Sequence, residues 1–595
     1  MSRLLFLVSA IALASALPGF WRAFSMSSAN GWPEFGDGLL FWLTWASDPG
    51  GRRLMLAAGL AVGLVALAVL ANSSRAWPKP LIGLQGFLAK TTTLGIDLVG
   101  HPVVVAVAVL LAAVPHAVAP MKRPDASGKP DVLFILLDTV RLDHMGWGGC
   151  ELDTTPKLDA LARQGAAFTQ TITQAPWTKP SVGTLMTGMV PGVHGAAGRR
   201  APLPYTNRTL AEALSSAGYR TAALSSNPNI TPLFGFEQGF QDFYVDTTEI
   251  AEKLSKAGGD WLAKGGEQPS FLYLHLNDAH YPYDPLPGYK GMFNQTGIEA
   301  HLDGLTEDAF RKGEGPGFTP EEVESLRLSF AEEIRYLDDV VGDFVAAQLA
   351  ANDNLLVVIC SDHGEEFLEH GDLGHAHSLH EELIRVPLQF AWSPALGEKL
   401  GLKAGLHDDQ VRHLDVLPTL LELTGLLEAW PQDLHTIQGE TLTPFLRLEG
   451  DQPERLAFSE TDHLGSPLSG PAGPLRALRT SKNKLVITDP WHKETAGRMW
   501  LYDLVADPGE HKNLVLEEDA LRESMIERMV ALMDLGWLVE RTHVADVSAS
   551  EEEKANLEAM GYAEGGAVDF GAEPEFAPGA IPFGEIESDL IKVKD

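Results

Sequence analysis

Short apolar runs recur between residues 131 and 361 of this chain, and each run is followed by polar residues. The runs are continuous rather than alternating, which is typical of strands buried on both faces of a sheet. They cover residues 132–137 before Asp138, 221–224 before Asn227, 271–276 before Asn277 and Asp278, and 355–360 before Ser361 and Asp362.

Helical patterns lie between these runs. Residues 156–165 and 210–218 place leucines three or four positions apart and close on a glycine, as helix C-termini often do. Alternating strands and helices predict an α/β fold with a large, mostly parallel sheet flanked by helices. Ligands bind such sheets beyond the carboxyl ends of the strands, so the polar residues after the runs should converge on one site.

The pattern changes after about residue 455. Residues 476–488 and 499–504 are typical of antiparallel strands, Asp507-Pro508-Gly509 is a turn signal, and a helix is expected around 517–533. Residues 565–584 are rich in Gly, Pro, Ala and Glu, which indicates a flexible tail. We therefore expect a smaller C-terminal antiparallel subdomain beside the large sheet.

The first 120 residues have a different character. Three stretches without charged residues, 4–21, 54–74 and 98–120, are long enough to cross a bilayer, which takes about 20 apolar residues. The first also fits a cleavable signal peptide, because Arg3 precedes it and small residues stand at 14–16. Two or three membrane helices follow from these alternatives, and both place the remainder of the chain outside the cytoplasm.

These patterns divide the chain into five parts. A membrane anchor covers 1–120 and a linker 121–130, which contains two prolines and a glycine. The α/β domain covers 131–455, its C-terminal subdomain 456–545, and an acidic, partly flexible tail 546–595.

Charge sharpens this division. The chain has 45 Lys and Arg against 80 Asp and Glu, a net charge of −35. Residues 1–120 carry seven of the cations and four of the acids, so the anchor has a net charge of +3 and the remainder −38. This balance excludes nucleic-acid binding through a broad basic surface. Only two cysteines are present, which excludes a disulfide-rich scaffold and a cysteine-ligated zinc cluster.

Two of the expected strand ends carry candidate metal ligands. Asp138 follows the first apolar run, and Asp362-His363 follows the last. Each segment alone is also compatible with a simple turn at the end of a strand. Together, two carboxylates and an imidazole at neighbouring strand ends suit zinc, manganese, magnesium or calcium.

A third segment, residues 175–188, begins a helix near Thr178 and Pro180. We expect Thr178 to cap this helix, since proline is tolerated in its first turn. The exposed N–H groups and the positive end of the helix would then favour a bound anion. A capped helix with no ligand explains the same residues.

In these segments the sequence resembles the alkaline phosphatase superfamily, and within it the sulfatase-like branch. The resemblance covers about residues 130–515, and the matching blocks follow the family's order. They include PDVLFILLDTVRLDH at 130–144, PWTKPSVGTLMTG at 176–188, DAHYPYDP at 278–285 and SDHGEEFLEHGDLGHAHSLHEELIRVPL at 361–388. The resemblance implies a divalent metal ion beside a hydroxyl nucleophile.

Carried over residue by residue, the family pattern makes Asp138, Asp362 and His363 metal ligands together with the nucleophile Thr178. One metal ion is favoured over two, and His377 would help to hold a second. Sulfatases carry, at the position of Thr178, the Cys or Ser that is oxidised to formylglycine, and an arginine at the position of Val182. Oxidation of a threonine gives a ketone rather than an aldehyde, so no formylglycine is expected.

The resemblance also suggests residues on the substrate side. His280 would protonate the leaving group, and His375 falls where sulfatases place a lysine that contacts the ester. Further contacts with substrate are expected from Lys179, His194 and His377. His275 is interpreted as a core histidine rather than a ligand. Arg141 and Asp143 are expected to brace the first metal loop by an ion pair, and Glu365-Glu366 and Glu381-Glu382 to orient the histidines.

A threonine nucleophile with an Asp-His ligand pair resembles the phosphodiesterases and membrane phospholipid-head-group transferases of the superfamily. We therefore expect phosphoryl transfer through Thr178 on anionic esters, such as lipid head groups or glycans, on the outer side of the membrane. Two alternatives stay open. One is a sulfatase that works without formylglycine, and the other is a catalytically silent membrane scaffold.

Overall fold

The computed structural model describes residues 126–266, 268–298, 318–430, 437–461, 474–488, 498–534 and 536 of the chain. Predictions for residues 1–120, including the membrane helices, and for the tail 546–595 lie outside these residues. No described helix is both long enough and apolar enough to cross a membrane.

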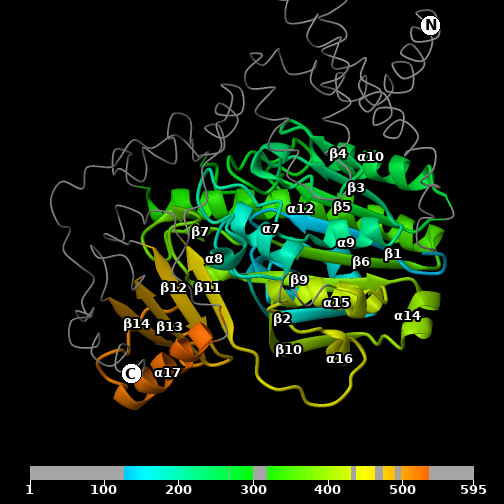
Figure 1. Cartoon of the computed structure of the whole chain (residues 1–595). Helices are drawn as coiled ribbons and strands as arrows, with labels where there is room; N and C mark the ends of the chain where they lie inside the picture. The colour runs from blue at the N-terminus through cyan, green and yellow to red at the C-terminus, as the bar shows by residue number, and fades with distance from the viewer. Residues whose placement is uncertain are drawn as a thin grey trace, which may run out of the picture. The chain divides into compact units, whose positions relative to one another are not determined.

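An eight-stranded sheet forms the centre of the described part (Figure 1). Every neighbouring pair is parallel except those that involve β9, which runs antiparallel to both of its neighbours. The order is β10 (Gly405–Arg412), β2 (Ala166–Ile172), β9 (Arg385–Trp392), β6 (Leu355–Ser361), β1 (Asp131–Leu137), β5 (Ser270–Leu276), β3 (Arg220–Ser225) and β4 (Asp242–Val245).

Both faces of this sheet are covered, which explains the continuous apolar runs. Along β1, Val132 and Phe134 belong to one hydrophobic cluster, and Leu133 and Ile135 belong to the other. The first cluster includes residues of α7 (Thr178–Thr187), α9 (Leu210–Ser216), α14 (Pro394–Leu400), α15 (Val416–Leu423) and α16 (Thr443–Leu446). The second includes residues of α6 (Pro156–Gln164), α10 (Ala251–Ala263) and α12 (Pro320–Ala351).

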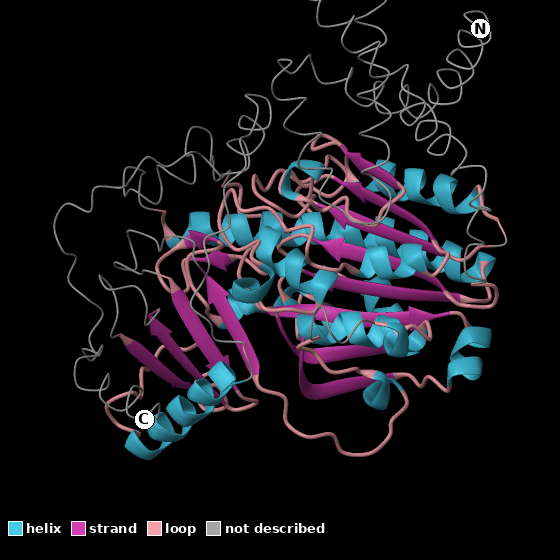
Figure 2. Cartoon of the chain, viewed as in Figure 1, coloured by secondary structure: helices cyan, strands magenta, loops and turns pink. Residues whose placement is uncertain are grey.

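A second, antiparallel sheet follows in the order β11 (Ala457–Thr461), β12 (Leu475–Arg479), β13 (Asn483–Thr488) and β14 (Met499–Asp503). Helix α17 (Asp519–Asp534) packs on it through Met525, Met529 and Leu532. Figure 2 shows this sheet and its helix beside the large sheet. The predicted α/β fold with a smaller antiparallel sheet is therefore confirmed for the described residues. The predicted run 476–488 is corrected, because it forms two strands, β12 and β13, joined by a turn.

Smaller elements lie in the connections between the strands of the large sheet. Between β6 and β9 lie the two-stranded pair β7 (Glu366–Phe367) and β8 (Leu373–Gly374), followed by the short helix α13 (Glu381–Ile384). The short helix α8 (Pro191–His194) follows α7. These connections carry most of the candidate site.

Candidate active site

Thr178 lies at the start of α7 and is fully buried. The expected capping role is wrong, because Trp177 occupies the N-cap position and Thr178 is the first helical residue. Its hydroxyl points instead toward the neighbouring strand ends, where Oγ1 lies 3.3 Å from Nε2 of His363. The hydroxyl of Thr178 is therefore directed at the candidate metal ligands.

Asp138 and Asp362 stand side by side at the carboxyl ends of two paired strands. β1 and β6 are parallel neighbours, and their last residues, Leu137 and Ser361, are register partners. The Nδ1 atom of His363 donates a hydrogen bond to the Gly364 carbonyl oxygen over 2.9 Å. A neutral His363 therefore carries its lone pair on Nε2, the atom that faces Thr178.

The donor set fits a divalent metal ion. Oδ1 of Asp138 and Oδ2 of Asp362 are buried and accept no hydrogen bond from the described residues. These oxygens lie 3.6 and 3.5 Å from Nε2 of His363. Ligand atoms held about 2.0–2.3 Å from one ion are spaced about 3–4 Å apart, so the distances suit a shared ion. An unpaired buried carboxylate oxygen is costly, and a cation removes that cost.

His275 is a buried core histidine, as the sequence interpretation expects, but it also has a role that this interpretation did not include. It is fully buried, as a core histidine would be, but its Nε2 lies 2.8 Å from Oδ2 of Asp138. Asn227 donates a second hydrogen bond to the same oxygen over 2.6 Å. With Asp138 and Asp362, His275 forms a group whose potential ligand atoms lie within 4.8 Å of one another. It orients Asp138 so that Oδ1 faces His363.

The sequence does contain a signal for this role of His275. Strand β5 pairs with β1, and His275 is the register partner of Leu136, two residues before Asp138. A histidine in the penultimate position of a strand beside a metal loop is placed to reach that loop. The apolar run around it concealed this position.

Burial and charge together set the ionisation of the two carboxyls. Burial opposes ionisation of Asp138, but the hydrogen bond and charge of His275 outweigh it and lower the pKa of Asp138. Burial and the nearby Asp138 raise the pKa of Asp362 to about 8. Burial also lowers the pKa of His363, which favours its neutral, ligand form. A bound cation would allow both carboxyls to be ionised together.

Two further histidines lie over this group. The ring of His375 is 4.4 Å from that of His363 and 5.1 Å from that of His280, measured between centroids. Nδ1 of His375 lies 3.0 Å from Oε1 of Glu365, and Nδ1 of His280 donates to the Tyr281 carbonyl oxygen over 2.9 Å. The structure thus brings His280 and His375 together with the predicted metal ligands.

The other predicted substrate contacts are directed elsewhere. Lys179 is fully buried, donates to the carbonyl oxygen of Arg199, and has its ammonium 4.2 Å from the ring centroid of Phe234. His377 contacts Oε2 of Glu366 through Nε2 and the carbonyl oxygen of His375 through Nδ1. Lys179 and His377 thus contact protein groups that surround the site.

His194 also lies behind α7. Its Nε2 donates to the Pro180 carbonyl oxygen over 3.0 Å, and its Nδ1 accepts a hydrogen bond from the Ala196 N–H. A Cβ atom on Gly183 would come within 2.6 Å of this ring, so glycine is required for the close approach. Val182, at the position of the sulfatase arginine, is part of the hydrophobic core and supplies no charge.

The predicted ion pair between Arg141 and Asp143 is confirmed, whereas Glu381 pairs with Arg479 and Lys484 rather than with a histidine. Arg141 forms an ion pair with Asp143 over 2.7 Å and another with Glu369 over 2.7 Å. Glu365 holds His375 as described above. These contacts fix the loops after β1 and β6 relative to each other.

Comparison with known proteins agrees with this geometry. Residues 130–426 match the family model described as Sulfatase. The chain belongs to the sulfatase-like branch of the alkaline phosphatase superfamily. It is therefore a hydrolase of this superfamily, whose members depend on metal ions.

Individual relatives differ in their chemistry. The chain is 23% identical to an ulvan-active sulfatase of Formosa agariphila over 70% of its own length and 83% of the relative's. It is 23% identical to a multifunctional alkaline phosphatase superfamily protein of Trinickia caryophylli, covering 65% of this chain and 91% of the relative. The crystal structure of a phosphonate monoester hydrolase of Agrobacterium radiobacter has the same fold, with a TM-score of 0.57 and 21% identity over 71% of this chain and 100% of that one.

Proposed function

We propose that this sulfatase-family protein cleaves phosphate monoesters or diesters by phosphoryl transfer through Thr178. The observation that carries the proposal is the position of the Thr178 hydroxyl, 3.3 Å from Nε2 of His363 and beside two buried carboxylate oxygens to which no described residue donates a hydrogen bond. A hydroxyl in this position meets the requirement for an activated nucleophile.

Asp138, Asp362, His363 and Thr178 would hold one divalent ion. When bound, such an ion lowers the pKa of a hydroxyl group and withdraws charge from a phosphoryl oxygen. The nature of the ligands, two carboxylates and an imidazole, is compatible with zinc or manganese as well as with calcium or magnesium.

The remaining chemistry belongs to the side chains. Oγ1 of Thr178 attacks phosphorus and gives its proton to solvent, while the bond from phosphorus to the leaving oxygen breaks. Protonated His280 donates its Nε2 proton to that oxygen. Water or an acceptor alcohol then attacks the phosphothreonine and gives its proton to His280, while the bond from phosphorus to Oγ1 of Thr178 breaks and Oγ1 recovers a proton from solvent. With water the reaction is hydrolysis, and with an alcohol it is transfer.

The side chain of Thr178 favours this chemistry over the formylglycine route. A threonine cannot be oxidised to an aldehyde, and Val182 provides no cation for a sulfate group. Similarity to the multifunctional superfamily protein of Trinickia caryophylli and to the phosphonate monoester hydrolase supports phosphorus-containing substrates.

A pair of threonine variants tests the nucleophile. Thr178→Val removes the hydroxyl but keeps the shape of the side chain, and should lower kcat on bis-p-nitrophenyl phosphate by at least about a thousandfold. Thr187→Val is the matched control, because Thr187 is buried in the same helix and its hydroxyl donates to the Gly183 carbonyl oxygen, away from the described site residues. Undiminished turnover in Thr178→Val would refute the assignment.

A sulfate-ester hydrolase is the second candidate, and the similarity to the ulvan-active sulfatase favours it. The measurement that separates the two is the ratio of kcat/KM for p-nitrophenyl phosphate esters to that for p-nitrophenyl sulfate. A ratio in favour of sulfate by orders of magnitude would replace the phosphate assignment. If the protein takes up no metal and turns over neither ester, the silent scaffold is the correct reading.

We further propose that residues 1–120 anchor the protein in a membrane with the catalytic domain outside the cytoplasm. The support is the three uncharged apolar stretches, each about as long as a bilayer crossing requires. Substrates would then be anionic esters of envelope lipids or glycans. Protease added outside sealed spheroplasts should digest the domain, and its full protection would contradict this orientation.

A further inference from the structure

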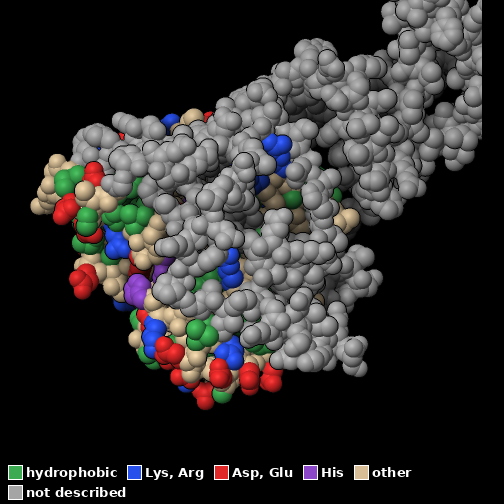
Figure 3. Space-filling view, turned by 90° about the vertical axis from the view of Figure 1, so that its left-hand side faces the viewer, with side chains coloured by type: hydrophobic (Ala, Val, Ile, Leu, Met, Phe, Trp, Pro, Cys, Tyr) green, Lys and Arg blue, Asp and Glu red, His purple; other side chains and the backbone are tan. Residues whose placement is uncertain are grey.

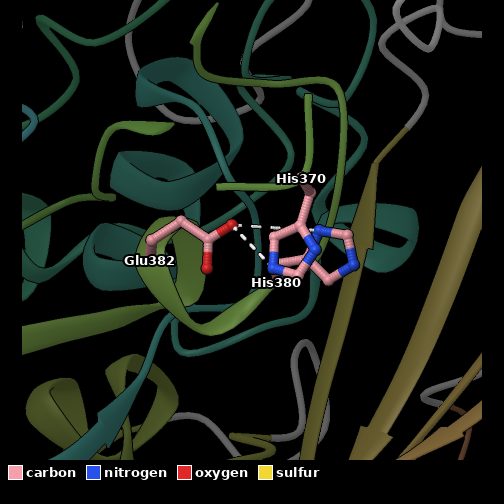
Figure 4. A group of neighbouring side chains, drawn as sticks. All are labelled: His370, His380 and Glu382. Atoms are coloured by element: carbon pink, nitrogen blue, oxygen red, sulfur yellow. Dashed lines mark ion pairs between the residues drawn. The ribbon is translucent and has the colours of Figure 1, made fainter. Parts of the chain in front are cut away.

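A second group of potential metal ligands lies outside the set around Thr178. It consists of His370, His380 and Glu382, which the chain brings together from the tip of the β7–β8 pair and from the start of α13. Figure 4 shows the carboxylate of Glu382 directed at the two imidazole rings. None of the three residues has a part in the reaction proposed above.

The distances within this group are close to those of a coordination sphere. Oε1 of Glu382 lies 3.4 Å from Nε2 of His370 and 3.9 Å from Nδ1 of His380. Ligands at about 2.0–2.2 Å from a tetrahedral zinc ion are separated by about 3.3–3.6 Å. The three potential ligand atoms all lie within 4.8 Å of one another, so a tilt of the imidazole rings would convert the group into a ligand set.

Glu382 supplies an independent observation that points to a cation as the ligand of the group. Its side chain is only 8% exposed, and Oε1 is buried and accepts no hydrogen bond from the described residues. Such an oxygen normally has a donor or a bound cation as its partner. Oε1 of Glu382 thus faces the two imidazoles without a hydrogen bond from the described residues.

The two rings are accessible from one side. His370 and His380 are stacked, with centroids 3.6 Å apart and an angle of 16° between the ring planes. Their side chains are 14% and 20% exposed. On the face of the molecule drawn in Figure 3, histidine side chains reach the surface among acidic and basic ones. An ion entering from solvent would tilt the rings apart so that both lone pairs meet it.

The C-terminal subdomain provides a third imidazole, and with it a fourth potential ligand. The ring of His511, which follows β14, is centred 5.7 Å from that of His370. The same seam is already held by charge, since Glu381 pairs with Arg479 over 2.7 Å and with Lys484 over 3.2 Å. His511, in the loop after β14, is thus the imidazole that the C-terminal subdomain places beside the group.

We infer that His370, His380 and Glu382 form a second divalent metal site, for zinc, with His511 as its outer ligand. Two imidazole nitrogens and one carboxylate suit zinc, whereas calcium and magnesium prefer oxygen ligands throughout. The role of the ion is structural. It joins the β7–β8 tip to α13 and to the C-terminal subdomain.

The position of this site connects it to the active site without sharing ligands. Glu366 accepts the backbone N–H groups of His370 and Asp372 through Oε1, and contacts His377 through Oε2. The segment from Asp372 leads directly through β8 to His375. A zinc ion at His370 would therefore fix the loop that presents His375 to the substrate.

Reciprocal variants of the full-length protein test this inference with zinc alone as the probe. After loading with zinc and dialysis, elemental analysis should find two equivalents in the wild type and one in Glu382→Gln. Asp138→Asn should also retain one, because it disrupts only the catalytic set. His380→Gln is the second variant at the new site. Its affinity for the second equivalent should fall about 100-fold or more, since even partners behind a ligand contribute 10- to 100-fold.

Thermal unfolding separates loss of the site from loss of the fold. Metal-free Glu382→Gln should unfold at or above the wild-type temperature, and zinc should stabilise it less than it stabilises the wild type. Wild-type zinc content and affinity in both Glu382→Gln and His380→Gln would overturn the inference. An unchanged zinc content in Asp138→Asn would instead count against the catalytic metal, so the two proposals fail separately.

Discussion

Neutralising Asp362 should stabilise the metal-free protein, although it removes a metal ligand. Asp138 and Asp362 present carboxylate oxygens within 4.8 Å of each other in a fully buried site. At an effective dielectric constant of about 20, two charges at that separation repel by about 3 kcal/mol. Burial and the charge of Asp138 raise the pKa of Asp362 to about 8, so at pH 7 the metal-free protein avoids this repulsion by binding a proton at Asp362, which costs a similar free energy. In Asp362→Asn this cost disappears.

The expected gain is therefore about 3 kcal/mol in the free energy of unfolding of the chelator-treated protein at pH 7. For a domain of this size that corresponds to an increase of about 3–6 °C in Tm. Zinc or manganese should reverse the order, because the wild type gains a full ligand set while Asp362→Asn lacks one charged ligand. Thermal unfolding with and without added metal measures both effects.

Asp415 provides the matched control. It is also a fully buried carboxylate, but it is paired with Arg412 over 2.7 Å and with Arg455 over 3.0 Å. Asp415→Asn leaves buried arginines without their counterion and should lower stability by about 3–5 kcal/mol with or without metal. A metal-free Asp362→Asn protein that is less stable than the metal-free wild type would refute the reasoning about the carboxylate pair.

Three more predictions follow from the same site. Glu365→Gln replaces the charge-assisted hydrogen bond to His375 by a neutral one. It should lower kcat/KM about 10- to 100-fold and alter the pH profile of kcat/KM. An unchanged pH profile would contradict a positioning role of Glu365. Removal of the metal by a chelator should abolish binding of a phosphate analogue as well as turnover, because residues 121–595 carry a net charge of −38 and repel anions. Calorimetry that finds unchanged affinity for the analogue would show that binding does not depend on the metal. Burial lowers the pKa of His413 to about 3, so below pH 6.5 only the unfolded chain binds that proton. Relative to His413→Gln, the wild type should therefore lose about 2 kcal/mol of stability between pH 7 and pH 5, and parallel curves in denaturant titrations would contradict this account.

The strands whose carboxyl ends carry the site residues could be predicted from the sequence, because burial on both faces of the sheet produces a continuous apolar run. Strand β2 was not predicted, since polar residues such as Gln170 interrupt its sequence AAFTQTI. The 32-residue helix α12 was also missed, because buried acids such as Glu332 and Glu333 obscure its apolar face. These acids accept backbone N–H groups of the segment 284–294, a tertiary role with no local signal.

The candidate site divides in the same way. Asp138, Asp362 and His363 could be predicted because each follows an apolar run whose end marks the edge of the sheet. The direction of a side chain could not. Lys179 follows Thr178 directly, yet its ammonium lies against Phe234 behind the helix. His370 and His380 stand ten residues apart, and only the packing of the β7–β8 pair against α13 stacks their rings.

The reversed direction of β9 has an evolutionary consequence. Because β9 runs antiparallel to β6, the chain leaves the sheet after Ser361 and re-enters it at Arg385, at the same end of the strands. No crossover helix has to span the sheet between them, so residues 362–384 can gain or lose length without disturbing the strand order. Insertions in the connection between β6 and β9 are therefore a route to new substrate preferences. Asp362 and His363 stay in place because they directly follow β6.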